Sequence, residues 1–216
     1  MTSATGQCFS RAVSRRAALG FTLALVARRA AAATLPVVTI LGDSITAGLG
    51  LVEDAALPSQ LARALERLGM RATVRGAGVS GDTSAGGLAR LDFSVQPDTA
   101  VCVVALGGND ILQGLAPEVL RANLAAIVRR LQARQIRVVL AGISVPPAVG
   151  PSYAREAEAA FREVARAARV PLVPDLLAGV GPALRQADGL HPDAAGVRVI
   201  AARLAPVVRR ALLGRR

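Results

Sequence analysis

At 216 residues, of which 52% are hydrophobic, the chain is long enough to form one globular domain with a substantial core. All 26 of its basic residues are arginine, which excludes catalysis through a lysine Schiff base. Only 2% of the residues are aromatic, so the stacking platforms of single-strand-binding proteins are lacking and we expect no nucleic-acid partner.

Residues 1–33 have the pattern of an export signal. Arg15 and Arg16 precede an apolar segment, 17–27, that is too short to span a bilayer, and small residues follow it. Paired arginines directly before such a segment are typical of the twin-arginine route. We therefore predict a cleaved signal peptide at residues 1–33 and a periplasmic or secreted domain at residues 34–216. An uncleaved membrane anchor and a misassigned start are the alternatives.

From residue 36 onward, short apolar segments alternate with amphipathic ones. The apolar segments are rich in Val, Ile and Leu without polar alternation, which predicts strands buried on both faces at 36–41, 72–74, 99–106, 137–143 and 171–176. Apolar residues at helical spacing predict helices at 59–69, 84–95, 117–135 and 152–170. A last helix follows Asp193 as its N-cap, with Pro206 kinking or ending it. This alternation predicts an α/β fold, a three-layer α/β/α sandwich with a mainly parallel five-stranded sheet.

The predicted mature domain contains one cysteine and one histidine. Cys102 lies within the apolar segment 99–106, so we expect a buried thiol without a disulfide partner. His191 is far from it in the sequence, and one residue of each kind does not supply a zinc ligand set. We therefore expect no metal site.

Polar residues follow the predicted strands at the points where each strand ends. In open α/β sheets, binding sites form at the carboxyl ends of the strands. Four such segments are informative, at 42–44, 76–87, 106–110 and 187–193. Although these segments are distant in sequence, we expect them to converge at one edge of the sheet.

His191 has a carboxylate three residues before it, in Asp188, with a glycine between them. This spacing allows a tight loop in which the carboxylate accepts a hydrogen bond from Nδ1, which leaves Nε2 free to take a proton from a serine hydroxyl. Nucleophilic serine catalysis needs this arrangement. Asp188 could instead only cap the turn. The order Ser44, Asp188, His191 is that of α/β-hydrolases, but no G-x-S-x-G elbow surrounds Ser44, which disfavours that fold.

Taken together, GDS at 42–44, SGDT at 80–83, GGND at 107–110 and DGLHP at 188–192 resemble the SGNH hydrolase family, also called GDSL-type esterases. The resemblance covers essentially the whole predicted mature chain and is closest to the branch of thioesterase I, lysophospholipase L1 and arylesterase. Ile45 replaces the leucine of the strict GDSL signature, which is a conservative departure.

The resemblance implies a role for each matching residue. Ser44 would be the nucleophile, His191 the general base and Asp188 the group that orients His191. The oxyanion hole would consist of the backbone N–H groups of Ser44 and Gly81 and the side-chain amide of Asn109. No cofactor is implied.

The implied function is hydrolysis of carboxylic esters, including aryl and acyl esters, acyl thioesters and lysophospholipids, through an acyl-enzyme. The partners would be a small acyl ester or lipid and, through Arg215 and Arg216, transient contact with a membrane surface; we expect a monomer. Asp43 and Asp110 would tie the loops together by backbone hydrogen bonds. The loop at 143–153 would line an aliphatic acyl groove.

Two alternatives remain open. A carbohydrate O-deacetylase or an acyltransferase could use the same triad. A flavodoxin-like binding module could hold a phosphate at the glycine-rich segment 76–81, but that segment lacks a well-placed G-x-G-x-x-G and would leave the pair Asp188 and His191 unexplained.

Overall fold

The computed structural model describes residues 1–2, 34–145 and 149–214. The predicted signal peptide, apart from Met1 and Thr2, therefore lies outside the described residues, as do Arg215 and Arg216. Within the described part of the chain, no helix is both long and apolar enough to cross a membrane.

Five parallel strands form the central sheet in the order β2, β1, β3, β4, β5. Their bounds are β1 Val37–Gly42, β2 Thr73–Gly78, β3 Thr99–Ala105, β4 Arg137–Ala141 and β5 Leu172–Val173. The prediction of a parallel five-stranded sheet is confirmed. In this order the chain runs outward from β1 in two directions, so the strand-end loops on either side of β1 leave a crevice between them.

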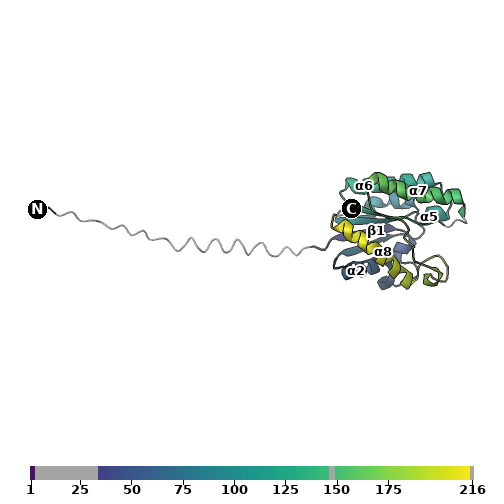
Figure 1. Cartoon of the computed structure of the whole chain (residues 1–216), viewed down its shortest axis with the longest axis horizontal. Coiled ribbons are helices and arrows are strands. Elements are labelled where there is room, and N and C mark those ends of the chain that lie inside the picture. Colours follow the sequence, from purple (N-terminus) through teal and green to yellow (C-terminus); the bar gives the residue numbers. More distant parts are fainter. Residues whose placement is uncertain (3–33, 146–148, 215–216) are drawn as a thin grey trace. The chain divides into compact units, whose positions relative to one another are not determined.

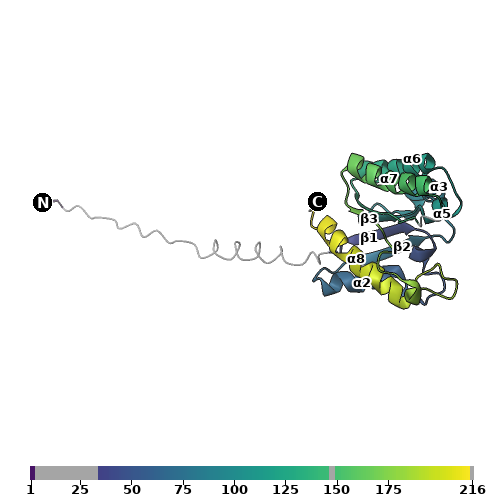
Figure 2. The ribbon, with the colours of Figure 1, turned by 45° about the vertical axis from the view of Figure 1, so that its right-hand side comes forward.

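Four long helices cover the sheet, two on each face (Figures 1 and 2). On one face lie α6 Pro117–Ala133 and α7 Pro151–Ala168; on the other lie α2 Leu57–Arg67 and α8 Ala194–Leu212. The short helices are α1 Ser44–Ala47, α3 Ser84–Ala89, α4 Leu91–Ser94 and α5 Gly108–Leu112, with single 3₁₀ turns at Glu53–Ala55 and Pro182–Leu184. The three-layer α/β/α architecture is therefore confirmed.

Successive side chains along the central strands point to opposite faces of the sheet and so contribute to the core layer on each face. Ile40 and Val103 pack with α2 and α8, whereas Leu41 and Val104 pack with α6 and α7, and all four are fully buried. Because both faces are covered, neither face needs polar residues, which explains the continuous apolar segments in the sequence. Each buried aliphatic side chain of this kind contributes about 1.5–3 kcal/mol to folding.

The strand predicted at 72–74 was too short, and the prediction that both of its faces are buried was wrong. β2 extends to Gly78, and its side chains are exposed or half-buried because it lies at the edge of the sheet. Gly78 looks like a loop residue in the sequence, but a Cβ there would lie 2.3 Å from the backbone nitrogen of Ala47. The glycine is needed because β2 packs closely against α1.

The structure corrects one helix prediction and decides another. The single helix predicted at 84–95 is broken into α3 and α4 at Arg90. Of the two outcomes predicted for Pro206, ending the last helix is excluded, because the helix continues to Leu212. Asp193 caps that helix as predicted, since its carboxylate accepts a hydrogen bond of 2.7 Å from the backbone N–H of Gly196.

Cys102 is fully buried in β3, as its apolar surroundings predicted. Burial raises the pKa of its thiol to about 12, because the thiolate would lose its hydration. This thiol is therefore unreactive at neutral pH.

Candidate active site

The strand-end segments converge on one cavity of about 370 Å³ at the carboxyl edge of the sheet. Ser44 after β1, Gly81 after β2, Asn109 after β3 and His191 before α8 all line it. Because β2 and β3 pair with β1 on opposite sides, the loops that carry Gly81 and Asn109 flank Ser44. The convergence predicted from the α/β pattern is therefore present.

Ser44 is the first residue of α1, directly after a tight exit from β1. A Cβ on Gly42 would lie 2.1 Å from Oγ1 of Thr46, so glycine is required by the lack of space. Asp43 is the N-cap, and its Oδ1 accepts a hydrogen bond of 3.1 Å from the backbone N–H of Ile45. Ser44 is thus fixed at the floor of the cavity, with 8% of its surface exposed.

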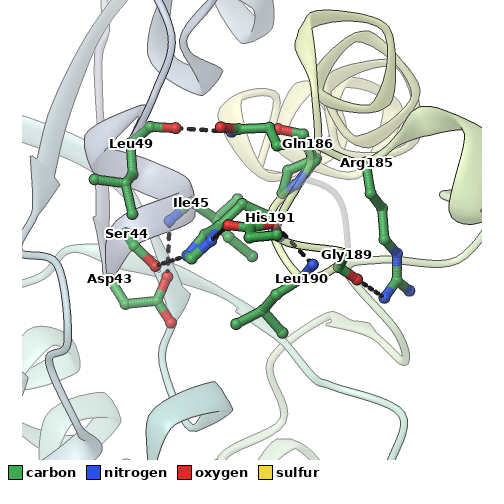
Figure 3. A network of polar contacts seen from close by, with 11 residues as sticks. Asp43, Ser44, Ile45, Leu49, Arg185, Gln186, Gly189, Leu190 and His191 are labelled. Atoms are coloured by element: carbon green, nitrogen blue, oxygen red, sulfur yellow. Dashed lines mark hydrogen bonds and ion pairs between the residues drawn. The ribbon is translucent and has the colours of Figure 1, made fainter.

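A continuous chain of hydrogen bonds joins Ser44 to the loop at residues 185–193, called here the His191 loop (Figure 3). Ser44 Oγ lies 2.8 Å from His191 Nε2, and His191 Nδ1 lies 2.6 Å from Asp188 Oδ2. The other carboxylate oxygen of Asp188 accepts the backbone N–H groups of Leu190 and His191 at 2.9 and 3.0 Å. The contacts predicted from the spacing of Asp188 and His191 are all present.

These bonds hold the pKa of Asp188 well below its ordinary value, at about 2. The largest cause is the hydrogen bond from His191, followed by the backbone N–H groups of Leu190 and His191. An ionised carboxylate only accepts hydrogen bonds, so Nδ1 of His191 must carry the proton and donate it. In the neutral ring Nε2 then accepts, and the Ser44 hydroxyl donates to it. This is the tautomer in which a histidine can deprotonate a serine.

Gly81 and Asn109 face the same cavity from opposite sides of Ser44. Gly81 has φ of +83°, a left-handed conformation that favours glycine, and no atom lies within 4 Å of where its Cβ would be. Asn109 lies in the first turn of α5, and its Nδ2 donates a hydrogen bond of 2.9 Å to the carbonyl oxygen of Asp82. An amide nitrogen carries two hydrogens, so Asn109 keeps one donor for another acceptor.

Comparison with known proteins decides the family. The model of the GDSL-like lipase/acylhydrolase family matches residues 40–199. The chain is 43% identical to esterase TesA of Pseudomonas aeruginosa over 173 residues, which cover 79% of this chain and 85% of that protein. The chain belongs to the GDSL-like lipase/acylhydrolase family.

Other GDSL relatives agree with this assignment. Thioesterase 1/protease 1/lysophospholipase L1 of Escherichia coli strain K12 is 35% identical, with 80% of this chain and 82% of that protein covered. The crystal structure of TesA superimposes with a TM-score of 0.76 at 37% identity, covering 81% of this chain and 99% of that one. The SGNH-hydrolase esterase AlinE4 gives a TM-score of 0.69 at 40% identity, covering 82% and 97%. The predicted family is confirmed, and the flavodoxin-like binding module is not supported.

In this GDSL fold Asp43 and Asp110, the two residues predicted to tie loops together, form different contacts. Asp110 joins two loops as predicted, because its carboxylate accepts the backbone N–H of Ser84 at 2.7 Å and the Ser84 hydroxyl at 2.5 Å. The Asp43 carboxylate accepts its hydrogen bond locally, from the backbone N–H of Ile45 in the adjacent helix, and so does not tie separate loops as predicted. Burial raises the pKa of Asp43 above its ordinary value.

The cavity walls are mainly aliphatic. Seven such side chains line it: Ile45, Leu49, Ile111, Leu112, Ile143, Leu177 and Leu190. Of the loop predicted to line the groove, Ile143 and Ser144 do so, whereas Tyr153 points elsewhere and donates a hydrogen bond of 2.8 Å to the carbonyl oxygen of Leu115. Residues 146–148 of that loop lie outside the described residues.

Sequence analysis did not identify two residues that hold the site in place, Arg90 and Gln186. Arg90 bonds the loop that carries Gly81, and Gln186 Nε2 donates to the carbonyl oxygens of Leu49 at 2.8 Å and Pro192 at 3.0 Å. Figure 3 shows Gln186 reaching from the His191 loop to the segment after Ser44. An arginine in an arginine-rich chain, and a glutamine in a loop, cannot be singled out without the tertiary contacts. In the described part of the chain, no cluster of three or more His, Cys, Asp or Glu residues could hold a metal ion.

Proposed function

We propose that this GDSL enzyme is a serine esterase in which Ser44 is the nucleophile, His191 the general base and Asp188 the residue that orients it. The observation that carries the proposal is the pair of hydrogen bonds, 2.8 and 2.6 Å, that joins Ser44 through His191 to Asp188 at the floor of the cavity. A serine hydroxyl is a weak nucleophile until a base within hydrogen-bond reach accepts its proton.

The first half-reaction forms an acyl-enzyme. Ser44 Oγ attacks the carbonyl carbon of the ester while its proton passes to His191 Nε2, and the charge on the imidazolium is stabilised by the Asp188 carboxylate. The carbonyl oxygen becomes an oxyanion. The tetrahedral intermediate collapses when the leaving alcohol or thiol takes the proton from Nε2, which breaks the ester bond.

The second half-reaction reverses these roles. A water molecule gives a proton to Nε2 and attacks the acyl carbon, and collapse returns that proton to Ser44 Oγ as the carboxylic acid leaves. In both steps the oxyanion would be bound by the backbone N–H groups of Ser44 and Gly81 and by the free amide hydrogen of Asn109. Donors that are already in place need no reorganisation when the charge develops.

The substrates we propose are aryl and acyl esters, with acyl thioesters and lysophospholipids as further classes. Two relatives support these classes, an arylesterase from Vibrio mimicus and the thioesterase 1/protease 1/lysophospholipase L1 of Escherichia coli. The aliphatic lining suits an acyl chain, since it replaces water around methylene groups. The cavity lies at the small end of the range for ligand pockets, which favours short and medium acyl chains.

Covalent labelling tests the nucleophile directly. A fluorophosphonate should inactivate the enzyme and add to Ser44, as seen by peptide mass spectrometry. The esterase EstA from Pseudoalteromonas, which is 27% identical to this chain, has a crystal structure in which the enzyme is inhibited by monoethylphosphonate. This supports the choice of a phosphonate probe. Ser152→Ala, at an exposed position in helix α7, is the matched control and should label normally. An adduct on Ser80 or Ser84 would refute the assignment of Ser44.

A substrate panel tests the reaction class. We expect hydrolysis of p-nitrophenyl esters from acetyl upward, with acyl-CoA and lysophospholipid assayed alongside. Release of acetate from polysaccharide with little turnover of longer acyl esters would favour a carbohydrate O-deacetylase instead. Transfer of the acyl group to an added alcohol in preference to water would favour an acyltransferase.

We also propose export of the enzyme through the signal at residues 1–33, on the sequence pattern alone. Replacing Arg15 and Arg16 by lysine should leave precursor in the cytoplasm if the twin-arginine route is used. Fractionation of expressing cells measures this. Normal export of the variant would exclude that route, though not export as such.

A further inference from the structure

Arg90, at the junction of α3 and α4, binds three segments of the site with one guanidinium group. Its Nη2 donates a hydrogen bond of 2.8 Å to the carbonyl oxygen of Gly42, at the end of β1. Its Nη1 donates a hydrogen bond of 2.9 Å to the carbonyl oxygen of Ala77 in β2 and another of 3.0 Å to the Ser94 hydroxyl. Its Nε donates a hydrogen bond of 2.6 Å to the carboxylate of Asp82. Asp82 lies in the loop of residues 79–83, called here the β2–α3 loop.

Two of these partners, Gly42 and Asp82, lie within two residues of a member of the proposed oxyanion hole. Gly42 lies two residues before Ser44, and its carbonyl oxygen also accepts the backbone N–H of Val79 at 3.2 Å, which joins the β2–α3 loop to the end of β1. Asp82 directly follows Gly81 in that loop. The carbonyl oxygen of Asp82 is also the acceptor for the Asn109 amide. The position of Asp82 therefore affects two donors that come from different elements.

The turn around Gly81 is closed by a local hydrogen bond of 3.1 Å, which the backbone N–H of Asp82 donates to the carbonyl oxygen of Val79. Gly81 itself has a left-handed backbone conformation, and no atom beyond its two chain neighbours lies within 4 Å of its Cβ position, so this turn has no side-chain packing at Gly81 and relies on hydrogen bonds. The pair of Arg90 and Asp82, by contrast, is largely shielded, with side-chain exposures of 19% and 14%. Charge-assisted hydrogen bonds in such surroundings are stronger than exposed ones.

We propose that Arg90 is a positioning residue for catalysis. Through Asp82 it holds Gly81 and Asn109 in place, and through Gly42 it holds the end of β1 that leads to Ser44. The three oxyanion donors are thereby kept at fixed positions relative to one another. The inference rests on the proposed esterase function. Arg90 does not contact substrate in this role; it acts by fixing groups that do. Lysine cannot replace it, because one ammonium group cannot reach the planar set of acceptors that the guanidinium fork reaches.

Arg90→Lys and Asp82→Asn test this inference on a short p-nitrophenyl ester. Each should lower kcat by about 10- to 100-fold with KM little changed, because donors displaced by a fraction of an ångström bind the transition state less well. Arg75 and Asp98 supply the matched control, since Arg75 in β2 binds Asp98 through two hydrogen bonds of 2.6 and 2.8 Å but both are exposed. Arg75→Lys and Asp98→Asn should leave kcat and KM unchanged.

A purely structural role would lower the melting temperature but not the turnover of the molecules that remain folded. Thermal unfolding and titration of active sites with a fluorophosphonate therefore accompany each assay, and kcat is expressed per titrated site. Asp82→Asn keeps the shape of the loop residue, so it remains informative if Arg90→Lys does not fold.

A double-mutant cycle with Asn109→Ala measures the coupling. Because Arg90 acts partly through Asn109, the double variant should lose less kcat than the product of the two single losses, by about 5-fold or more. Losses that multiply, or an unchanged kcat per site in both Arg90→Lys and Asp82→Asn, would overturn the inference. Failure of the proposed function would look different, since the unaltered enzyme would then hydrolyse no ester.

Discussion

The two halves of the site are held in place by different kinds of contact. In the His191 loop the ring is oriented by local bonds, since Asp188 binds Leu190 and His191 within four residues and its side chain is 45% exposed; Gln186 adds one distant bond from this loop, to Leu49. The opposite half depends on bonds between distant segments, with Arg90 and Asp82 at 19% and 14% exposure. The difference indicates that the proposed general base, His191, is oriented by local sequence, whereas the proposed oxyanion donors are oriented by tertiary packing.

Removing the reacting groups should have the largest effect. We expect Ser44→Ala and His191→Ala each to lower kcat by about 10⁴- to 10⁶-fold, because neither half of the reaction can proceed without the nucleophile or the base. Stopped or continuous assays with p-nitrophenyl butyrate measure this, with thermal unfolding to show that the variants fold. Residual activity above one hundredth of the unaltered enzyme in either variant would contradict the assignment.

Removal of one oxyanion donor should have the next largest effect. Asn109→Ala should lower kcat by roughly 10²- to 10³-fold with KM little altered, since the donor binds the charge that develops only in the transition state. If Asn109 serves instead to fix the Asp82 carbonyl in the loop, the melting temperature will fall and turnover per titrated site will stay nearly constant. Steady-state kinetics and thermal unfolding of the same preparation separate the two outcomes.

Loosening the His191 loop should have a smaller effect. Gln186→Leu removes the side-chain hydrogen bonds to Leu49 and Pro192, and loss of neutral hydrogen bonds should lower kcat/KM by about 2- to 10-fold. The rate of Ser44 labelling by a fluorophosphonate should fall in parallel. Gln132→Leu is the control. Gln132 Nε2 donates a hydrogen bond of 3.0 Å to the carbonyl oxygen of Ala168, which joins α6 to α7 away from the site. Equal losses in both variants would mean that the effect is general destabilisation.

The pH dependence of stability should show the smallest effect. The pKa of Asp188 is about 2 in the folded protein, below its ordinary value of 3.8, so ionised Asp188 favours the folded state above that ordinary value. This contribution should disappear as the pH falls from 3.8 through 2. In urea unfolding, Asp188→Asn should therefore lose less stability between pH 4 and pH 2 than the unaltered protein. Identical slopes in the two proteins would show that the bond from His191 does not lower this pKa.

Much of the architecture follows from short-range patterns in the sequence. Apolar segments without alternation predicted the central strands, because β1, β3 and β4 are covered on both faces. The three-residue spacing of Asp188 and His191 predicted their contact, because a loop that short leaves the carboxylate few other places to go. Asp193 was predicted as a helix N-cap for the same kind of local reason.

The sequence by itself therefore determined the order of the main strands and helices along the chain, the parallel sheet and the loop that pairs Asp188 with His191, all of which depend on periodicity or on neighbours within a few residues. Only the tertiary structure decided that β2 continues to Gly78, because that glycine is required by the approach of α1. It also decided the partners of Arg90 and Gln186, which lie up to 137 residues away along the chain. Hydrogen bonds over such separations leave no local pattern, because any polar side chain that reaches the acceptor in the folded protein could form them.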